Sequence, residues 1–385
     1  MKCKLGALCS YVKEKVKTET LDKKNYISTE NMLPNKGGIT LASSLPSTEY
    51  TSKYQAGDIL ISNIRPYFKK IWKAEYDGGC SNDVLVLRAN DDCYIDFLYY
   101  ALASDSFFDY ATATAKGTKM PRGDKTAIMD FMVSCFDLKI QVYIADILKS
   151  LDNKISNNNK INDNLEQQAE ALYKAWFIDY LPFAGEKPEE WNNTIIEELT
   201  SLVSRGITPK YTEDSDQIVI NQKCVRDHRI DLSLARTHTP KKINEKWLQY
   251  GDLLINSTGE GTLGRAAQVW FKPEKMTVDS HVTIVRPKSK ELMYYIGFWG
   301  LVHEKEIESL HTGSTGQTEL PRERIKAMEL VLPDQTTLAI FNAIVQPMTE
   351  TIINNQIQNN KLAALRDALL PKLMSGEIDV ENIRV

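Results

Sequence analysis

The chain has 385 residues, of which 42% are hydrophobic and 25% charged, so it can bury sizeable cores and is long enough for about two to three domains. No apolar run approaches the roughly 18 residues of a membrane-spanning helix, and the N-terminal stretch lacks the apolar core of a signal peptide, so we expect a cytoplasmic protein. The net charge of −4 argues weakly against nucleic-acid binding, and a DNA-binding role would need clustered positive charge.

Catalytic motifs are absent from the sequence. The six cysteines include no C-x-x-C pair, which favours reduced thiols in hydrophobic cores over disulfides or a zinc site. The five histidines lack metal spacing, and no G-x-x-x-x-G-K-[ST] phosphate loop occurs. The N-P-P-[YF] and D-P-P-[YF] motifs of amino-methyltransferases are also missing. A hidden nuclease site stays open as an alternative, but we predict a non-catalytic chain.

Residues 1–142 mix short apolar runs with turns, which predicts a globular α/β module. Gln55–Arg65 reads as a turn that leads into a buried strand, and Asp83–Arg88 as a second strand. Asp96–Tyr110 has helical spacing and many aromatic residues, a pattern more typical of a core face than of base stacking. A loop with four cations, residues 115–125, precedes the last strand of the module.

A long helix is predicted over residues 143–182, ending near Pro182. Its apolar residues alternate by three and four, which is the heptad spacing of a helix that faces a partner helix. The predicted seam consists of Leu148, Leu151, Ile155, Asn158, Asn162, Leu165 and Leu172.

The plan of the first module then repeats in residues 190–335. Gln249–Asn256 matches the first buried strand, His281–Arg286 matches the second, and Glu319–Arg322 matches the end of the cationic loop. A second long helix is predicted over residues 336–375, and a shift of 197 residues aligns it with the first helix without a gap. Its seam consists of Met348, Ile352, Asn355, Asn359, Leu362 and Leu369.

Two matched seams in one chain favour mutual pairing over the alternative that each helix packs only on its own module. Antiparallel pairing with matched seam centres would place Asn162 opposite Asn359, although the sequence does not fix that register. The seam from Leu148 to Trp176 spans roughly 42 Å, which is on the order of one turn of DNA, roughly 34–36 Å. We therefore expect two modules that read two different half-sites separated by a gap.

In the first module, the segment that leaves the buried strand combines polar, basic and aromatic residues. Arginine can pair bidentately with guanine and asparagine with adenine, whereas lysine mainly contacts phosphate. The favoured DNA-contacting residues are Asn63, Arg65, Lys69 and Lys70, interleaved with Tyr67 and Phe68. The second choice is the cationic loop with Lys116, Lys119, Arg122 and Lys125.

In the second module, the matching loop is rich in glycine and hydroxyl residues. Its G-x-G-x-x-G match, Gly259–Gly264, lacks the βαβ setting and the acidic residue of a nucleotide site, so a nucleotide site is the weaker alternative. A further candidate is Arg226–Arg229. The predicted DNA-contacting residues are Ser257, Thr258, Arg265, Ser314, Gln317 and Arg322, the last with Arg324 nearby.

The order of module, long helix, module and long helix resembles the specificity subunit of a type I restriction–modification system. The resemblance is carried by Gly57–Ser62, by Gly251–Asn256, by Thr312–Gln317 ahead of Leu320–Arg322, and by the closing stretch Leu365–Asp379. It covers nearly the whole chain, and the repeat layout is specific, whereas the single short motifs are not.

The resemblance implies that the modules are target recognition domains and that the helices serve as a spacer and a docking platform. The implied partners are double-stranded DNA, two methyltransferase (modification) subunits and restriction subunits that join them. S-adenosylmethionine, ATP and Mg would then belong to the partner subunits, and this chain would hold no cofactor. The predicted fold is two α/β modules of mixed sheet and helices joined by an antiparallel two-helix coiled coil. The alternative is a protein-binding scaffold without base readout, which the acidic net charge mildly favours.

Overall fold

The computed structural model describes residues 2–313 and 318–380, and the chain divides into two units. The first unit comprises Met1–Asn157 and Gln358–Val385, and the second comprises Asn158–Ile357. The division crosses two long helices, α4 (Leu138–Phe177) and α9 (Gln335–Ser375), so each unit holds one module and a part of both helices. None of the helices within the described ranges is both long and apolar enough to cross a membrane.

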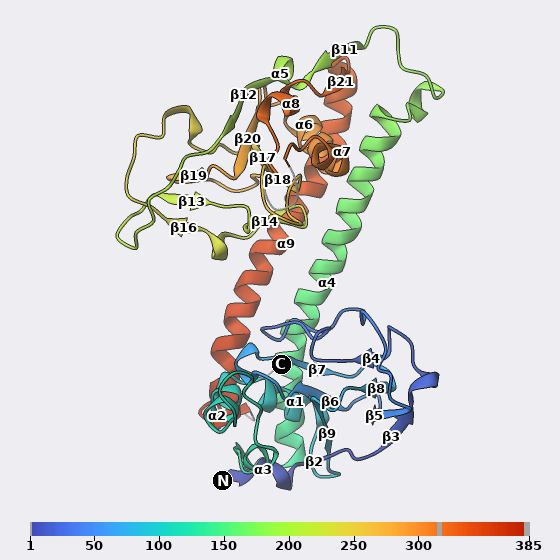
Figure 1. Ribbon diagram of the computed structural model, residues 1–385, viewed down its shortest axis with the longest axis vertical. Helices are drawn as coiled ribbons and strands as arrows, with labels where there is room; N and C mark the ends of the chain where they lie inside the picture. Colours follow the sequence, from blue (N-terminus) through green and yellow to red (C-terminus); the bar gives the residue numbers. More distant parts are fainter. Residues whose placement is uncertain (1, 314–317, 381–385) are drawn as a thin grey trace. The chain divides into compact units, whose positions relative to one another are not determined.

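The first unit is built on two four-stranded sheets (Figure 1). The main sheet is antiparallel, with the order β2 (Cys9–Tyr11), β9 (Val84–Ala89), β6 (Ile59–Ser62) and β7 (Ile71–Lys73). In the other sheet β4 and β8 pair in parallel, and the order is β3 (Lys15–Lys17), β5 (Tyr50–Tyr54), β8 (Gly78–Cys80) and β4 (Tyr26–Ile27). The remaining elements are β1 (Lys2–Lys4), which pairs with β10 (Met132–Ser134), and the helices α1 (Ile95–Ala103), α2 (Asp105–Ala113) and α3 (Lys125–Met129).

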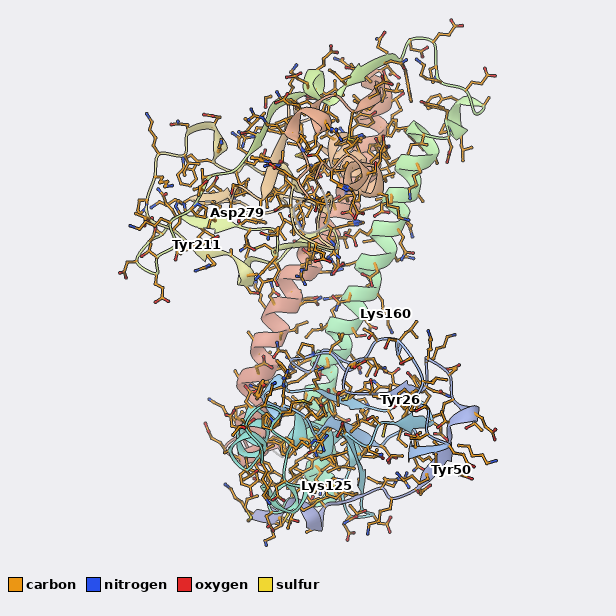
Figure 2. All side chains as sticks on the ribbon, in the orientation of Figure 1. Tyr26, Tyr50, Lys125, Lys160, Tyr211 and Asp279 are labelled. Carbon is orange, nitrogen blue, oxygen red and sulfur yellow. The ribbon has the colours of Figure 1, made fainter. Side chains whose placement is uncertain are left out.

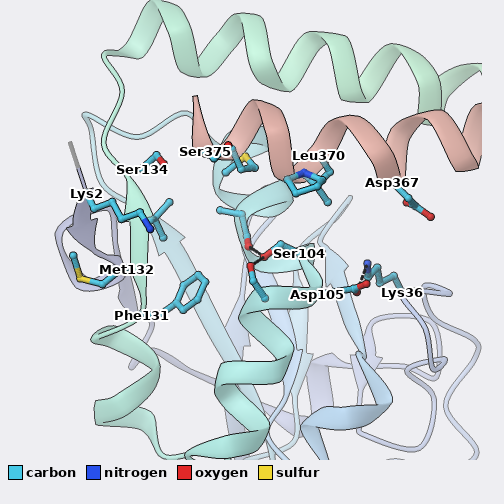
Figure 3. A pocket seen from close by; sticks show the side chains of 15 residues that line it. Lys2, Lys36, Ser104, Asp105, Phe131, Met132, Ser134, Asp367, Leu370 and Ser375 are labelled. Atoms are coloured by element: carbon cyan, nitrogen blue, oxygen red, sulfur yellow. Dashed lines mark hydrogen bonds and ion pairs between the residues drawn. The ribbon is translucent and has the colours of Figure 1, made fainter. Parts of the chain in front are cut away.

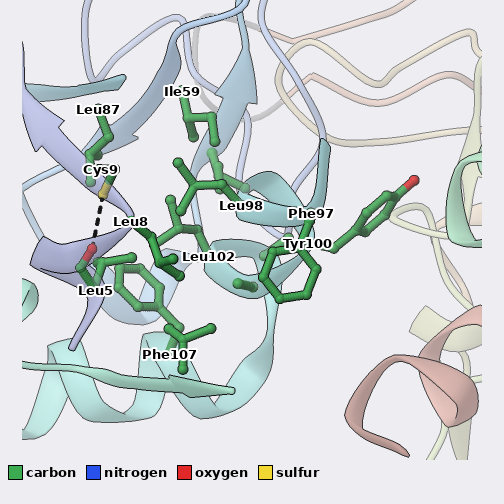
Figure 4. Packing of buried hydrophobic residues seen from close by; sticks show 14 of the residues in the cluster. Leu5, Leu8, Cys9, Ile59, Leu87, Phe97, Leu98, Tyr100, Leu102 and Phe107 are labelled. Carbon is green, nitrogen blue, oxygen red and sulfur yellow. Dashed lines mark hydrogen bonds between the residues drawn. The ribbon is translucent and has the colours of Figure 1, made fainter. Parts of the chain in front are cut away.

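The aromatic face of α1 and α2 packs into the core of the first unit, as the sequence predicts. Phe97, Leu98 and Phe107 are fully buried (Figure 4). The same cluster includes Leu148 from the start of α4 and Leu373 from the end of α9. The hydrophobic effect therefore holds this stretch of the helix pair against its module.

The second unit repeats the main sheet of the first. Its antiparallel order is β12 (Thr200–Arg205), β20 (Val282–Pro287), β17 (Leu253–Asn256) and β18 (Ala266–Gln268). A smaller sheet has the order β16 (Arg236–Thr237), β13 (Ile218–Ile220) and β19 (Met276–Val278), and two strand pairs are β14 (Val225–Arg226) with β15 (Arg229–Ile230) and β11 (Asn192–Ile195) with β21 (Glu329–Leu332). The helices of this module are α5 (Ile196–Leu199), α6 (Met293–Val302), α7 (Glu304–Ser309) and α8 (Arg322–Lys326).

A buried ion pair explains the repeated Gly-Asp motif. In the first unit, both carboxylate oxygens of Asp58 accept hydrogen bonds from Arg88, at 2.7 and 2.8 Å. In the second unit, Asp252 accepts from Arg286 at the same two distances. The preceding glycine has a positive φ in both units, 94° at Gly57 and 89° at Gly251, which a glycine adopts without steric cost. The motif is therefore structural and locks the turn to the neighbouring strand.

The two long helices run antiparallel, because residues further along α4 contact residues earlier in α9. Within the first unit, Asp152 of α4 accepts a hydrogen bond from Arg366 of α9 at 2.7 Å. Within the second unit, the ring of Tyr173 on α4 lies 6.2 Å from that of Phe341 on α9. The predicted antiparallel helix pair is thus confirmed, and packing of each helix on its module alone is excluded.

The register differs from the expectation of matched seam centres. Asn162 accepts a hydrogen bond from Asn355 at 2.8 Å, one helical turn before the expected Asn359. This register also brings Asp152 and Arg366 into an ion pair and packs the helix ends into the two cores, so contacts beyond the centre of the heptad pattern favour it. Each predicted seam residue of both helices is buried or partly buried.

The first long helix begins and ends about one turn earlier than predicted. Asp137 precedes α4 and accepts a hydrogen bond from the backbone N–H of Ile140 at 2.9 Å, so it caps the helix. Asp334 does the same for α9 through Thr337, at 3.0 Å. The sequence prediction missed the cap at Asp137, whereas the second helix lies within one residue of its predicted start.

Candidate nucleic-acid interface

Two loops that the sequence singled out in the first module lie against each other. The loop after β6 donates the backbone N–H of Arg65 to the carbonyl of Pro121 at 2.8 Å. In return, Gly123 donates its N–H to the carbonyl of Asn63 at 3.0 Å. The first and second choices of DNA-contacting segment therefore form one surface.

Polar atoms without partners occur in this surface. Asn63 is 8% exposed, and its Oδ1 has no hydrogen-bond partner among the described residues. The Nε of Arg65 is likewise buried and unpaired within the described part of the chain, and Arg65 has a left-handed φ of 50°. Buried polar groups are nearly always satisfied, and strained backbone clusters at ligand sites. Asn63 and Arg65 therefore combine unsatisfied polar atoms with a strained backbone in the loop after β6.

The two lysines of the favoured segment already have partners within the module. Lys69 pairs with Asp105 at 2.9 Å, and Lys70 donates to the carbonyl of Thr29 at 2.6 Å. Burial lowers the pKa of Lys70, although it is only partly enclosed. Both amines therefore serve contacts within the module.

The cationic loop is more accessible. Lys119 is exposed and forms no ion pair with any residue that the structure describes. Lys116 pairs with Asp124 at 2.5 Å, and the exposed Arg122 pairs with the partly buried Asp83 at 3.1 Å. Lys125, the first residue of α3, is also exposed (Figure 2). Such surface pairs are weak and can exchange for phosphate.

The second module brings its two corresponding loops together in the same way. Leu320 donates its N–H to the carbonyl of Ser257 at 2.8 Å, and Thr258 forms a backbone bridge with Glu319. Two predicted contacts, Ser314 and Gln317, lie outside the described residues.

The side chains of the second module correct part of the prediction. Ser257 is fully buried, and its hydroxyl is 2.6 Å from that of Thr283, so this side chain serves the fold. Thr258 lies at the surface, 2.7 Å from His281. Arg265 is partly exposed and its guanidinium has no hydrogen-bond partner among the described residues, whereas Arg322 pairs with its neighbour Glu323 at 3.0 Å.

The glycine-rich loop is not a nucleotide site. It connects β17 and β18, which pair antiparallel, and no helix follows it directly. A dinucleotide fingerprint requires a strand followed by a helix whose N-terminus faces the phosphates. Gly259, Gly261 and Gly264 all have positive φ, so they serve the sharp turns of this connection.

In the candidate segment Arg226–Arg229, the charges of His228 and Arg229 are used within the second unit, whereas Arg226 is exposed. His228 lies 3.1 Å from Glu170 of α4 and 3.7 Å from Glu304 of α7. Hydrogen bonds to these carboxylates raise the pKa of His228 to about 10. Arg229 pairs with two further acids of α4, at 3.1 and 3.6 Å. This hairpin tip therefore fastens the module to the helix.

The contact between the two loops of each module could not be predicted, because the loops lie far apart in the sequence. The signal was present in the repeats Met120-Pro-Arg122 and Leu320-Pro-Arg322, which end the second loop in both modules. Groups of three or more histidine, cysteine or acidic side chains that could hold a metal are absent from the described ranges.

Comparison with known proteins identifies the modules. The family model described as type I restriction modification DNA specificity domain matches residues 3–167 and 188–364. The specificity subunit of the type I restriction enzyme MjaIX from Methanocaldococcus jannaschii is 28% identical over 318 residues, covering 76% of this chain and 71% of that protein. The specificity subunit of the type I restriction enzyme HindI from Haemophilus influenzae is 23% identical over 438 residues, covering 92% and 94%.

A solved structure shares the fold. The S subunit of a type I restriction–modification system from M. genitalium aligns with a TM-score of 0.58 at 16% identity, covering 97% of this chain and 96% of that one. Two tandem domain matches, together with the two repeated modules and the antiparallel helices, agree with the fold expected from the sequence. The chain belongs to the family of type I restriction–modification DNA specificity proteins and carries two specificity domains in tandem.

Proposed function

We propose that this chain is the DNA-recognition subunit of a type I restriction–modification complex and that each module reads one half of a split target. One observation carries the proposal: both modules build a two-loop surface at the same place, at the end of β6 in one and of β17 in the other. The loops differ in sequence between the modules, so the two half-sites should differ as well.

Each module offers two side chains of these loops for DNA contact. In the first module, the exposed Lys119 and Arg122 suit phosphate and guanine contacts, and in the second, the partly exposed Thr258 and Arg265 suit base or phosphate contacts.

Methylation and cleavage then belong to partner chains. The sequence lacks the motifs of an amino-methyltransferase and of an ATP-driven motor. Methyltransferase subunits would dock on the helices, and restriction subunits would join them. S-adenosylmethionine, ATP and Mg²⁺ would be bound by those chains.

A salt series tests DNA recognition. The chain, co-purified with its methyltransferase subunit, is titrated with its target DNA and with scrambled DNA. We expect a steep salt dependence and a preference for the target of roughly 10³-fold or more. Lys119→Ala should weaken binding to all sequences and reduce the salt slope by about 1. Lys154→Ala, an exposed lysine of α4, is the matched control.

The contrary outcome is informative. A protein-binding scaffold would bind both DNAs equally, and Lys119→Ala would behave like Lys154→Ala. That result would refute base readout by these modules.

The helix pair gives a second test. Inserting seven residues into each helix at equivalent seam positions adds about 10 Å, or roughly three base pairs at about 3.4 Å each. We expect the gap in the recognised target to lengthen by that amount while both half-sites stay unchanged. An unchanged gap would refute the role of the helices as a spacer.

A further inference from the structure

A groove of about 270 Å³ lies in the first unit between α2, β10 and the last turns of α9 (Figure 3). Ala101, Leu370 and Met374 contribute apolar surface to it, and Asp105 and Asp367 lie at its rim. The groove is smaller than a site for a drug-sized ligand, which occupies roughly 300–1,000 Å³. Its size suits a single large side chain.

The second unit shows what fills the corresponding place. There, the indole of Trp299 stacks on His303 at 5.8 Å between centroids, and His303 meets the ring of Tyr173 edge-on at 6.4 Å. Trp299 is fully buried, and Tyr173 is 2% exposed. This stack closes the space between α6, α7 and α4 from within the chain.

The internal repeat pairs each ring with a small residue of the groove. Tyr173 corresponds to Leu370 by the shift that aligns the two long helices. Trp299 occupies the α6 position that corresponds to Ala101 on α1, counting from the start of each helix. His303 and Ser104 are the residues between the paired short helices, and Ser104 also lines the groove. In the first unit, the smaller side chains of Leu370, Ala101 and Ser104 thus stand in place of these three rings, and a cavity remains.

The charged residues beside these positions also differ between the two units. In the second unit, the cation His228 bridges Glu304, the first residue of α7, and Glu170 of α4. In the first unit, Lys36 pairs with Asp105, the first residue of α2, at 3.1 Å.

The carboxylate that corresponds to Glu170 is Asp367 of α9. It is 59% exposed and pairs, within the described residues, with its chain neighbour Arg366. This exposed carboxylate shares the single cation Arg366 with Asp152, whereas in the second unit Glu170 lies against a separate cation, His228.

We propose that this groove is an interaction surface for a partner protein that inserts one aromatic side chain, followed in its sequence by a basic residue that faces Asp367. The aromatic ring would take the place of the missing stack, and the cation that of His228. Large aromatic anchors in a pocket typically dominate protein interfaces. Because buried Trp299 and Tyr173 occupy the corresponding place in the second unit, the partner would distinguish the first unit from the second.

A peptide titration tests the proposal on the full chain. The probes are N-acetyl-Trp-Arg-amide, N-acetyl-Trp-Gln-amide and N-acetyl-Ala-Arg-amide, followed through the NMR methyl signals of Met132, Leu370 and Met374, which line the groove. We expect saturable shifts of these methyls with Trp-Arg, weaker binding of Trp-Gln by about two- to fivefold, and no binding of Ala-Arg.

Two variants assign the site. Leu370→Tyr restores a ring of the second unit and should abolish Trp-Arg binding, whereas Leu365→Tyr, at an exposed position of α9 outside the groove, should not. Asp367→Asn should reduce Trp-Arg binding to the level of Trp-Gln without changing Trp-Gln binding. Because Asp367 is at the surface, this variant stays informative if Leu370→Tyr does not fold.

Three outcomes would overturn the proposal. The first is no saturable shift with Trp-Arg, or equal binding of Ala-Arg. The second is binding that appears only after residues 381–385 are removed, which would make this chain its own occupant. The third is self-association that Leu370→Tyr abolishes, which would assign the groove to a second copy.

Discussion

The two units hold the same pair of helices with different chemistry. In the first unit, Asp152 receives hydrogen bonds from Arg366 and from the hydroxyl of Tyr100, each at 2.7 Å. In the second unit, the positions that correspond to Asp152 and Arg366 are Thr349 and Ala169, and neither is charged.

Aromatic rings take over in the second unit. Phe341 of α9 lies 4.9 Å from Phe177 of α4, and Phe177 lies 4.9 Å from Tyr295 of α6. The corresponding residues of the first unit are Ile144, Met374 and Phe97, which are mostly aliphatic. Duplicated modules can therefore keep one backbone plan while one joins its two long helices to each other by an ion pair and the other by rings packed edge to face.

The difference also appears in buried charge. Asp96 of α1 is held by Lys73 of β7 and by Lys149 of α4, the latter at 2.6 Å. Burial alone would raise the pKa of Asp96, but the hydrogen bonds from Lys149 and Lys73 bring it below its ordinary value. The place of Lys73 is taken by Gln268 in the second unit, which bonds to the backbone carbonyls of Gly251 and Met293.

The largest expected effect removes an aromatic ring from the second unit. Phe341→Ala leaves a cavity among Tyr173, Phe177 and Phe298, and should lower the free energy of unfolding by about 3–5 kcal/mol. Urea unfolding measures this loss. Ile344→Ala, at an exposed position one turn on, is the control. If Phe341→Ala lowered the free energy of unfolding no more than Ile344→Ala does, the aromatic rings would not be what stabilises the helix pair in the second unit.

The ion pair of the first unit gives the next effect. Asp152→Ala removes the acceptor of the Tyr100 hydroxyl and leaves Arg366 with only its chain neighbour Asp367, and should cost about 1–3 kcal/mol in urea unfolding. Thr349→Ala, at the corresponding place in the second unit, removes a single bond to the carbonyl of Val345 and should cost less. Equal costs would mean that the two units do not differ in this respect.

The asparagines of the seam should affect register more than stability. Replacing both Asn162 and Asn355 by leucine removes a buried polar contact and should raise the free energy of unfolding by about 1 kcal/mol while permitting shifted pairings. Spin labels at the exposed positions Lys160 and Asn354 report the register through their distance distribution. A distribution as narrow as that of the parent chain would show that the asparagines do not set the register.

The smallest effect depends on pH. The pKa of His228 is raised to about 10 in the folded chain by Glu170 and Glu304, above about 6.5 in the unfolded chain. The stabilisation from these ion pairs is complete below pH 6.5 and is lost as the pH rises towards 10. His228→Gln should remove this slope from the pH dependence of unfolding, and exposed His311→Gln should keep it. If the slope persisted in His228→Gln, the ion pairs of His228 with Glu170 and Glu304 would not be its source.

Periodicity and repetition were enough to predict the architecture. The heptad spacing and the shift of 197 residues predicted the two helices and their pairing, because hydrophobic spacing along a helix is a local property. The register was not predictable, since it depends on Asp152 and Arg366, which are distant in sequence. The helix start was missed because Asp137 acts through a single capping bond.

The site was harder to predict for a physical reason. Residue type indicates what a side chain can bind, but not whether it reaches the surface. Ser257 has a suitable hydroxyl and is fully buried, and His228 and Arg229 have suitable charges that are neutralised by α4. The contact between the two loops of each module joins segments about 60 residues apart, such as Arg65 and Pro121, and local patterns do not report such pairings.

The central claim is that two unlike modules of one chain each read half of a split DNA target. The most direct measurement is a map of methylated sites in a host that expresses this chain with its methyltransferase subunit, before and after residues 190–335 are exchanged for the second domain of a relative. The account predicts a split motif with two different halves, of which one changes on exchange and the other stays. A continuous motif, or a change in both halves, would contradict it.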